Sequence, residues 1–284
     1  MKKRLLYSLI VITAFTACQK EYSAENGGDT SGTIIGADCR ISKIAYSDSA
    51  TGTSLGSISA TIDASDMVTD ITQFDSLTLT IDQNRQPQYF GDTVYIDADE
   101  YYIFDATTKR INSFHGMIDP TVPGSTEFDI AYNYDVVTGY LLTKSYSYTT
   151  LPGIPYQMVT YTYTGGNLTH METDDLFSNQ IIKDADLSYY NTISPKNFIY
   201  LFPDENTYPE VNQFFNFGTK STNAIQNLKV NYYTSGVVTD STVSHFSSYI
   251  LSRDNYVVSV YMIGDDQSTI PAAEGKLNFT YHCK

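Results

Sequence analysis

The stretch FDIAYNYDVVTGYLLTKSYSYTT, residues 128–150, carries the pattern that decides the fold of this chain. Two runs in which apolar and polar residues alternate stand on either side of a polar loop over 135–139. Alternation with a period of two predicts strands that bury one face, and the loop between them predicts an antiparallel hairpin. Aromatic residues opposite one another stabilise such a hairpin. The expected cross-strand pairs are Tyr134–Tyr140, Tyr132–Leu142 and Phe128–Tyr146.

A second hairpin is expected in MVTYTYTGGNLTHMET, residues 158–173. The Gly165–Gly166 pair is a two-residue turn signal, and it predicts that Tyr163 lies opposite Leu168. This register places His170 on the same face as the tyrosines. Three further stretches show an aromatic strand, a polar turn and a second strand: 101–114, 187–202 and 228–243. The pattern fits either a degenerate repeat of hairpins or an ordinary meander.

One segment departs from alternation. In residues 208–217 the spacing of Val211, Phe214 and Phe215 gives an apolar stripe of helical period. Pro209 suits the first helical position and Gly218 the position after the last turn. A short helix over about 209–217 is therefore expected, packed on the sheet. Residues 118–126 and 151–155 are expected to be surface loops.

The composition agrees with a protein made of strands and turns. The chain has 284 residues with 25 Tyr, 14 Phe and no Trp, and it has 24 Asp but only 8 Glu. Tyrosine fits half-buried strands, and aspartate favours turns over helices. We predict a mainly all-β protein built on one large antiparallel β-meander sheet, twisted or curved, with Tyr-rich hairpins. Nothing marks a domain boundary after residue 37, so residues 37–284 are expected to form one domain.

The first 17 residues have the pattern of a signal peptide. Residues 2–4 are basic, and Leu5–Ala17 is an apolar run of 13 residues. This run is too short to span a bilayer as a helix but suits the apolar region of a signal peptide. The alternative is a short anchor helix that stays in place.

The end of this run, Phe15-Thr16-Ala17-Cys18, resembles a bacterial lipobox, with Phe15 where leucine is usual. The resemblance implies that Cys18 carries the lipid and begins the mature protein, which would place it at the outer membrane, facing the periplasm or the cell surface. The polar residues 18–36 predict a flexible tether.

The charge excludes one class of partner. The formal net charge is −15. Removal of residues 1–17 takes away three positive charges and no negative ones, which leaves −18. Such a surface repels nucleic acid and anionic lipid headgroups, so we expect no nucleic-acid partner and membrane contact through the lipid anchor alone.

Two other cysteines lie near the ends of the expected domain. Cys39 precedes its first strand, and Cys283 is the penultimate residue. An exported protein meets oxidising conditions, so these two residues are candidates for a disulfide. Alternation places Cys283 on the apolar face of the last strand, with Leu277 and Phe279. Two buried free thiols are the alternative.

A search for reactive groups finds no convincing site. GTSLG (52–56) matches a serine-nucleophile motif, but Ser54 lacks the strand before it and the helix after it that the motif requires. The four histidines share no spacing, and the acidic clusters do not match a calcium loop. We therefore expect no catalytic residue, no metal and no cofactor. The histidines are His115, His170, His245 and His282, and the acidic clusters are Asp97, Asp99, Glu100 and Asp265, Asp266.

Several features together resemble a known group of proteins. The lipoprotein signal, the polar tether, CRISKI (39–44), FNFGTKSTNAI (215–225) and the terminal LNFTYHC (277–283) are similar to uncharacterised Bacteroidota lipoproteins with a domain of unassigned function. The hairpins also resemble the Tyr-Asp repeats of secreted bacterial shell proteins. The resemblance implies an extended antiparallel sheet in the cell envelope, and it implies no catalytic residue. Four triplets resemble an O-glycosylation signal of Bacteroidota envelope proteins: 48–50, 75–77, 92–94 and 240–242.

These observations lead to three functional hypotheses. The first is a lipid-anchored, monomeric envelope protein that acts as a non-catalytic binding or structural component, with a glycan or protein ligand. The second is an envelope hydrolase that acts on glycans through a carboxylate pair that the sequence does not identify. The third is an accessory subunit of an outer-membrane complex.

Overall fold

A computed structural model describes residues 39–48, 51–75, 80–118, 126–202, 211–264 and 275–283. The chain contacts separate a large compact unit, Asp38–His282, from a second unit that comprises Met1–Ala37 and Cys283–Lys284. The large unit is called the β domain below. The expected signal peptide, Cys18 and the tether lie outside the described residues.

The β domain contains one sheet of 17 strands in its described residues, and this confirms the predicted all-β fold. The strands are β1 (Cys39–Asp48), β2 (Ser54–Ile62), β3 (Val68–Asp75), β4 (Thr80–Arg85), β5 (Gln88–Phe90), β6 (Thr93–Asp97), β7 (Glu100–Phe104), β8 (Ile111–Met117), β9 (Glu127–Tyr134), β10 (Leu141–Tyr148), β11 (Pro155–Thr164), β12 (Asn167–Asp175), β13 (Gln180–Tyr189), β14 (Ile225–Thr234), β15 (Val237–Leu251), β16 (Val257–Ile263) and β17 (Gly275–Cys283).

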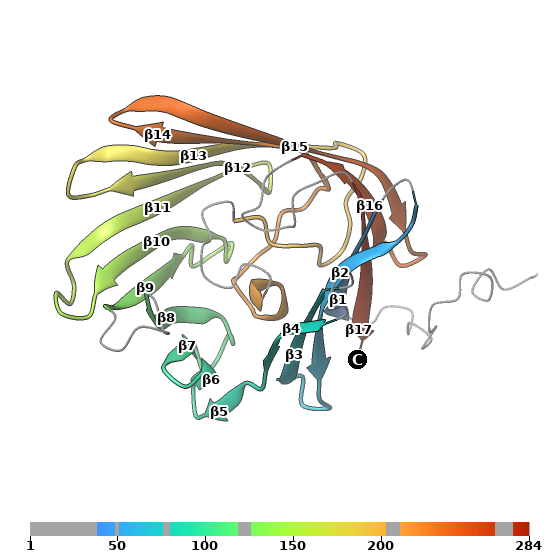
Figure 1. Cartoon of the computed structure of the whole chain (residues 1–284), viewed down its shortest axis with the longest axis horizontal. Coiled ribbons are helices and arrows are strands. Elements are labelled where there is room, and N and C mark those ends of the chain that lie inside the picture. The colour runs from blue at the N-terminus through green and yellow to red at the C-terminus, as the bar shows by residue number, and fades with distance from the viewer. Residues whose placement is uncertain are drawn as a thin grey trace, which may run out of the picture. The chain divides into compact units, whose positions relative to one another are not determined.

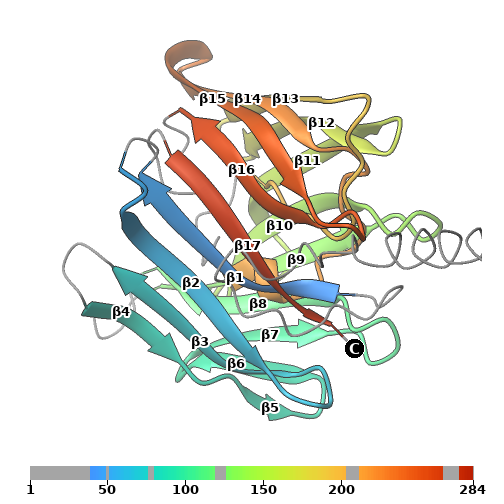
Figure 2. The ribbon, with the colours of Figure 1, turned by 90° about the vertical axis from the view of Figure 1, so that its right-hand side faces the viewer.

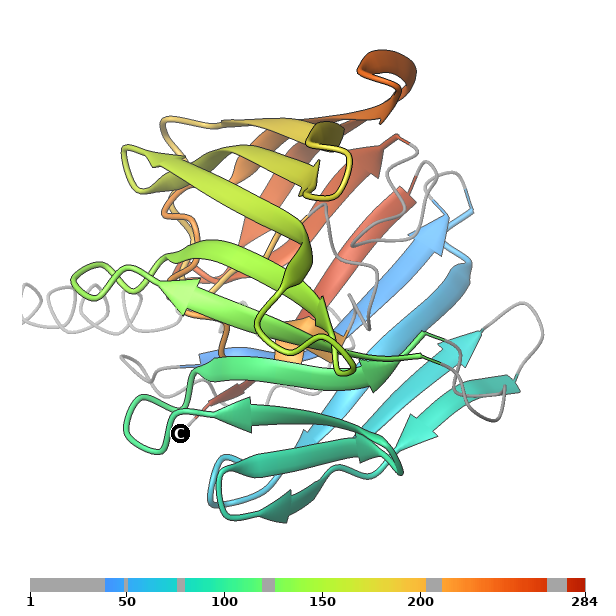
Figure 3. The same cartoon turned by 90° about the vertical axis from the view of Figure 1, so that its left-hand side faces the viewer.

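The strands follow one another as a meander. Consecutive strands pair antiparallel in two runs, one from β1 to β4 and the other from β5 to β17. β1 also pairs with β17, which joins the two runs into a single sheet. Figure 2 shows β16, β17, β1, β2 and β3 side by side, and Figure 3 shows the succession from β6 to β12.

Alternation along the strands divides the sheet into a buried inner face and a wetter outer face. In β9, Phe128, Ile130 and Tyr132 are buried, and the residues between them are exposed or half-buried. Each fully buried side chain of this size stabilises the fold by about 1.5–3 kcal/mol relative to an exposed one. The regular alternation therefore fixes which face of the sheet packs inward.

The long connection between β13 and β14 covers the inner face. We call residues 190–202 and 211–224 the inner segment; it lies within the curve of the sheet in Figure 1. Phe217 is completely buried, and its ring contacts those of Tyr102, Tyr132 and Tyr200. A sheet that is apolar on one face must bury that face, and here part of the same chain does so.

The inner segment tests two predictions. The helix expected over about 209–217 is confirmed in part, because the described residues of this stretch form a 3-10 helix, η1 (Val211–Phe214), that is shorter than expected; Pro209 lies outside the described residues. The second strand expected within 187–202 is wrong, because β13 ends at Tyr189 and the described residues 190–202 form no strand. Phe198–Phe202 are buried without a break, so both sides of this stretch meet protein and the alternation of a half-buried strand is absent.

The hairpin registers were predicted in part. Tyr163 lies opposite Leu168, as expected. In the hairpin of β9 and β10, an irregularity between Leu141 and Thr143 shifts the pairing, so the expected aromatic pairs are wrong. A similar irregularity between Thr162 and Tyr163 places His170 opposite Thr162, away from the buried tyrosines. A bulge inserts one residue and reverses the faces beyond it, which alternation alone does not reveal. The observed pairs are Tyr134–Leu141, Tyr132–Lys144, Ile130–Tyr146 and Phe128–Tyr148.

Candidate functional site

A small cavity lies at the inner face of the sheet. A cavity of about 20 Å³ lies between the inner segment and β11–β14, with Leu168, Phe198 and Ile225 in its wall. This volume suits about one water molecule, whereas a pocket for a small molecule needs several hundred Å³. This cavity is therefore too small for a small-molecule ligand.

A charged residue belongs to this core. The side chain of Lys144 is completely buried, and its ammonium nitrogen lies 5.6 Å from the ring centre of Tyr132, 6.0 Å from that of Tyr161 and 5.3 Å from that of Phe202. Aromatic faces attract a cation at such distances, more strongly where water is excluded. The observed register places Lys144 opposite Tyr132, so its ammonium group faces the aromatic core.

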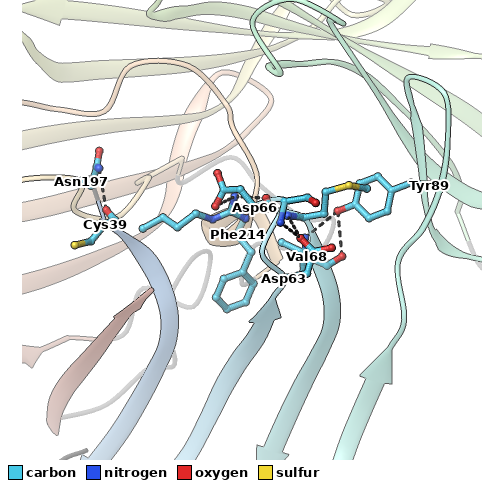
Figure 4. Close-up of polar contacts among 10 residues, drawn as sticks. Cys39, Asp63, Asp66, Val68, Tyr89, Asn197 and Phe214 are labelled. Carbon is cyan, nitrogen blue, oxygen red and sulfur yellow. Dashed lines mark hydrogen bonds and ion pairs between the residues drawn. The ribbon is translucent and has the colours of Figure 1, made fainter. Parts of the chain in front are cut away.

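The start of β1 is fixed to both the inner segment and the turn between β2 and β3 (Figure 4). The Arg40 guanidinium donates hydrogen bonds to the carbonyls of Phe214, at 2.7 Å, and Asp66, at 3.0 Å, and it forms an ion pair with the Asp66 carboxylate at 3.4 Å. The backbone of Cys39 also accepts a hydrogen bond from the Asn197 side chain at 2.9 Å. These contacts link the first strand to two distant parts of the sequence.

Tyr89 lies in the neighbouring part of the same region and bonds to the backbone of Val68 (Figure 4). Its hydroxyl accepts a hydrogen bond from the Val68 amide and donates one to the Val68 carbonyl, at 3.2 and 3.1 Å. Burial raises the pKa of Tyr89 to about 12. Tyr89 therefore stays neutral at physiological pH and bonds β5 to β3.

The predicted cysteines lie at the start of the first strand and at the end of the last one. Cys39 is the first residue of β1 and Cys283 the last of β17, and both are disulfide-bonded. Cys18 lies outside the described residues, so its lipidation stays a prediction.

Three hairpin turns share a motif that the sequence analysis missed. Asp105, Asp135 and Asp175 each begin a turn, and each carboxylate accepts hydrogen bonds from the backbone amides two and three residues later. These bonds lower the pKa of all three carboxyls. The pattern Asp-x-x-Thr/Ser, followed by a residue with positive φ, would have identified the turns from sequence.

The histidines of the outer face form cross-strand pairs. The Nδ1 atoms of His115 and His170 lie 2.8 Å from the carboxylates of Asp129 and Asp186, each on the next strand. His245 forms a similar hydrogen bond with Asn227. The structure brings no two of these three histidines together, so they form local contacts of the sheet surface.

Aromatic side chains form a row on the outer face of β5–β8. Ring centres lie 5.8 Å apart for Phe90 and Tyr95, 5.1 Å for Tyr95 and Tyr101, and 4.8 Å for Tyr101 and His115. Tyr95, Tyr101 and His115 lie directly opposite one another on successive strands. We call Phe90, Tyr95, Tyr101 and His115 the aromatic row. Alternation showed the tyrosines of β6 and β7, but only the strand pairing aligns them.

The other residues that the sequence singled out do not form a reactive site in the described residues. Ser54 is exposed and begins a strand, so no helix follows it to hold it in a nucleophile turn. Asp97 lies opposite Glu100 in the hairpin of β6 and β7, and Asp265 and Asp266 lie outside the described residues. No group of three or more metal-binding side chains occurs in the described part of the chain.

Glu100 is an unusual member of that hairpin. Its side chain is buried, and its Oε2 atom has no hydrogen-bond partner. Burial raises the pKa of Glu100, and the nearby negative charge of Asp97 raises it further. The carboxyl therefore holds a proton more readily than an exposed glutamate does.

The expected glycosylation triplets are only partly described. Asp92–Val94 reaches into β6 and Asp240–Thr242 lies in β15, whereas Ser49, Ala50, Ser76 and Leu77 lie outside the described residues. Among the described residues, no helix has the length and apolarity needed to cross a membrane.

Comparison with known proteins gives no family. No family model matches the sequence, and no curated protein is significantly similar to it. Solved structures do share the fold. A porin-like protein from Bacteroides uniformis ATCC 8492 superposes with a TM-score of 0.59 at 12% identity, over 88% of this chain and 99% of that one.

Two further structures match more distantly. A porin-like protein from Bacteroides vulgatus ATCC 8482 has a TM-score of 0.49 at 12% identity, over 86% of this chain and 99% of that one. The TcdB2-TccC3 structure has a TM-score of 0.26 at 11% identity, over 83% of this chain and 14% of that one. At such identities the Bacteroides uniformis structure establishes the fold alone, a large antiparallel sheet found in a Bacteroides porin-like protein.

Proposed function

We propose that this protein is a monomeric lipoprotein of the outer membrane that binds a glycan or protein ligand on the outer face of its sheet, without catalysis. Cys18 would carry the lipid, and residues 18–36 would hold the β domain away from the membrane. The observation that carries the proposal is the cover of the inner face by the inner segment, in which Phe198–Phe202 and Phe217 are buried. The outward-facing side chains are the surface that the described sheet offers to a ligand.

The coarser part of this proposal has support from two sides. The signal-like N-terminus and the acidic composition suit an exported protein, and the structural neighbours from Bacteroides are porin-like proteins. The outer face also offers aromatic and polar side chains in rows, because cross-strand neighbours align there.

One observation favours the rival hydrolase. Glu172 on β12 lies directly opposite Asp184 on β13, and Asp184 accepts hydrogen bonds from Asn231 and Tyr233. Directly opposite side chains project from the same face of the sheet with Cβ atoms about 5 Å apart, so two carboxyls lie on one face here, as a glycosidase requires. If this pair hydrolyses glycans, Asp184→Asn should abolish the activity and leave glycan binding intact.

A glycan array probed with the full-length protein in detergent tests the binding proposal, with released sugars measured on the same glycans. Binding without release supports a non-catalytic component. Release of sugar that Asp184→Asn abolishes would replace the binding proposal with the hydrolase.

The anchor has its own test. Cells fed a fatty-acid analogue should label the wild-type protein, and Cys18→Ala should take up none because the acyl acceptor is gone. Label that persists in Cys18→Ala would show that the anchor proposal is wrong.

A further inference from the structure

The buried carboxyl of Glu100 is a feature of the described core that the proposed function does not use. Glu100 is the first residue of β7, where Glu100 and Tyr102 are buried and Tyr101 between them is half-buried. The side chain of Glu100 is 5% exposed, and its Oε2 atom has no hydrogen-bond partner. A buried carboxylate that lacks part of its hydrogen bonds costs free energy, and protonation removes most of this cost.

The neighbouring strand leaves room for this carboxyl at Gly116. A Cβ atom at Gly116 would lie 3.5 Å from the Oε1 atom of Glu100 and 2.5 Å from a ring carbon of Phe114. Phe114 and Tyr102 are each 1% exposed, and their ring centres are 4.8 Å apart. The carboxyl of Glu100 therefore has a defined place beside a packed aromatic pair.

The charged groups that act on Glu100 come from its own hairpin and from β4. Asp97 on β6 lies opposite Glu100, and Asp99 precedes it in the turn. Burial raises the pKa of Glu100, and the negative charges of Asp97 and Asp99 raise it further. The Met117 amide on β8 and the Arg85 guanidinium on β4 act in the opposite direction without cancelling the rise.

Ionisation of Glu100 weakens the packed state of the hairpin of β6 and β7. Below the ordinary carboxyl pKa, the group is protonated in both the packed and the opened hairpin, and it carries no cost of a buried charge. As the pH rises from the ordinary pKa through the raised one, the opened hairpin loses the proton first, so opening becomes more favourable. Above the raised pKa, both states are ionised and the whole cost remains.

We propose that Glu100 is a pH-sensitive switch: the hairpin of β6 and β7 packs firmly while this carboxyl is protonated and opens more readily once it is ionised. Tyr95 and Tyr101 belong to the same hairpin, and their rings lie 5.1 Å apart on its outer side. The switch therefore sets how well this part of the outer face is ordered at a given pH. The inference goes beyond the proposed function and does not depend on it, because it concerns the hairpin whatever the surface binds.

Hydrogen exchange of the full-length protein in detergent, followed by mass spectrometry between pH 5 and pH 8, tests the switch. Labelling times are scaled so that the intrinsic exchange of a free amide is equal at every pH. We expect the amides of β6 and β7 to exchange about threefold faster at pH 8 than at pH 5, because opening is more favourable there. The amides of β13 and β14 should keep a constant rate on this scale.

Variants assign the effect to one carboxyl. Glu100→Gln keeps the size of the side chain but cannot ionise, so protection of the hairpin should no longer depend on pH. Asp97→Asn removes an exposed charge that raises the pKa of Glu100, so the midpoint of the transition should move to lower pH. The matched control is Glu127→Gln, the same replacement at an exposed position, which should keep the wild-type profile.

Two results would overturn the inference. One is constant protection of β6 and β7 in the wild type from pH 5 to pH 8, and the other is a wild-type pH profile in Glu100→Gln. If Glu100→Gln does not fold, the midpoint of Asp97→Asn decides, and a midpoint that does not move would contradict the switch. Binding on the glycan array is a separate measurement and bears on the proposed function alone.

Discussion

At the scale of single residues, aspartate has a specific structural task in this protein. At three hairpin turns a carboxylate accepts hydrogen bonds from backbone amides that have no carbonyl partner on a neighbouring strand. The three residues are Asp105, Asp135 and Asp175. Short polar side chains that bond to the following backbone are a general means of forming such turns. The excess of aspartate over glutamate thus has a local physical cause.

The lowered pKa values of the turn carboxyls lead us to expect that the free energy of unfolding falls at acid pH. The pKa of each turn carboxyl is lowered in the folded state. Its contribution to the free energy of unfolding is therefore complete well above the ordinary carboxyl pKa and is lost as the pH falls through the lowered value. The triple variant Asp105→Asn, Asp135→Asn, Asp175→Asn should lose less stability between pH 5 and pH 2 than the wild type, because its turns have no carboxyl to protonate. Urea unfolding across this range checks the prediction, and parallel pH curves would contradict it.

Lys144 gives a second prediction at this scale. Lys144→Ala should lower the free energy of unfolding by about 2–4 kcal/mol, because it leaves a cavity among Tyr132, Tyr161 and Phe202. Lys144→Met preserves most of the volume and should cost less. Urea titration at neutral pH measures both. Equal losses for the two variants would show that the charge, rather than the volume, stabilises this site.

At the scale of elements, the inner segment packs on the inner face of the meander sheet and completes the hydrophobic core. Its backbone bonds to strand ends and hairpin turns of the sheet: for example, the Asn216 carbonyl accepts from the Ile111 amide, and the Thr219 and Thr222 amides donate to the carbonyls of Gly139 and Gly166. Gly166 has a φ of +83°, and a Cβ there would lie 2.6 Å from the Thr222 hydroxyl. Glycine is therefore required at this turn both for its backbone conformation and for the close approach.

Loss of an inner-segment aromatic ring should destabilise the whole sheet. Phe217→Ala should lower the free energy of unfolding by about 3–5 kcal/mol, because the ring is completely buried against three tyrosines. Val136→Ala is the control, since Val136 is 93% exposed at a hairpin tip and should change stability by less than about 0.5 kcal/mol. Differential scanning calorimetry of both variants provides the comparison. A Phe217→Ala protein with wild-type Tm would show that the inner segment is not part of the cooperative core.

At the scale of the whole β domain, β1 and β17 meet although they come from opposite ends of the sequence. The Ser42 hydroxyl donates to the Thr280 carbonyl at 3.3 Å, and the Ser47 hydroxyl donates to the Lys276 carbonyl at the same distance. We propose that Cys39 and Cys283, which are both disulfide-bonded, form one bond that fastens this pair of strands. A crosslink across a loop this long restricts the unfolded chain strongly.

The proposed bond has a direct test. Replacement of both cysteines by alanine, or reduction of the wild type, should lower the free energy of unfolding by about 2–5 kcal/mol. Mass spectrometry of the unreduced protein should yield a peptide that joins residues 39 and 283. Free alkylation of both thiols before reduction would refute the bond.

Sequence reasoning reached the fold class because alternation and turn residues act locally. The turn at Gly165–Gly166 and the pair Tyr163–Leu168 follow from neighbouring residues alone. The register of β9 and β10 did not, because a bulge depends on which side chains the opposite face can accept. The aromatic row was not predicted either, because its residues on β6, β7 and β8 become neighbours only through the pairing of these strands.

The sequence by itself determined an all-β chain, its hairpins and the two end cysteines, because period-two alternation, glycine turns and composition are properties of short stretches. Only the tertiary structure decided that β17 returns to β1, that Lys144 meets the rings of Tyr132, Tyr161 and Phe202, and that residues 190–202 and 211–224 cover the inner face. The physical reason is burial: an apolar sheet face must be covered, and which segment covers it depends on contacts between residues far apart in the chain.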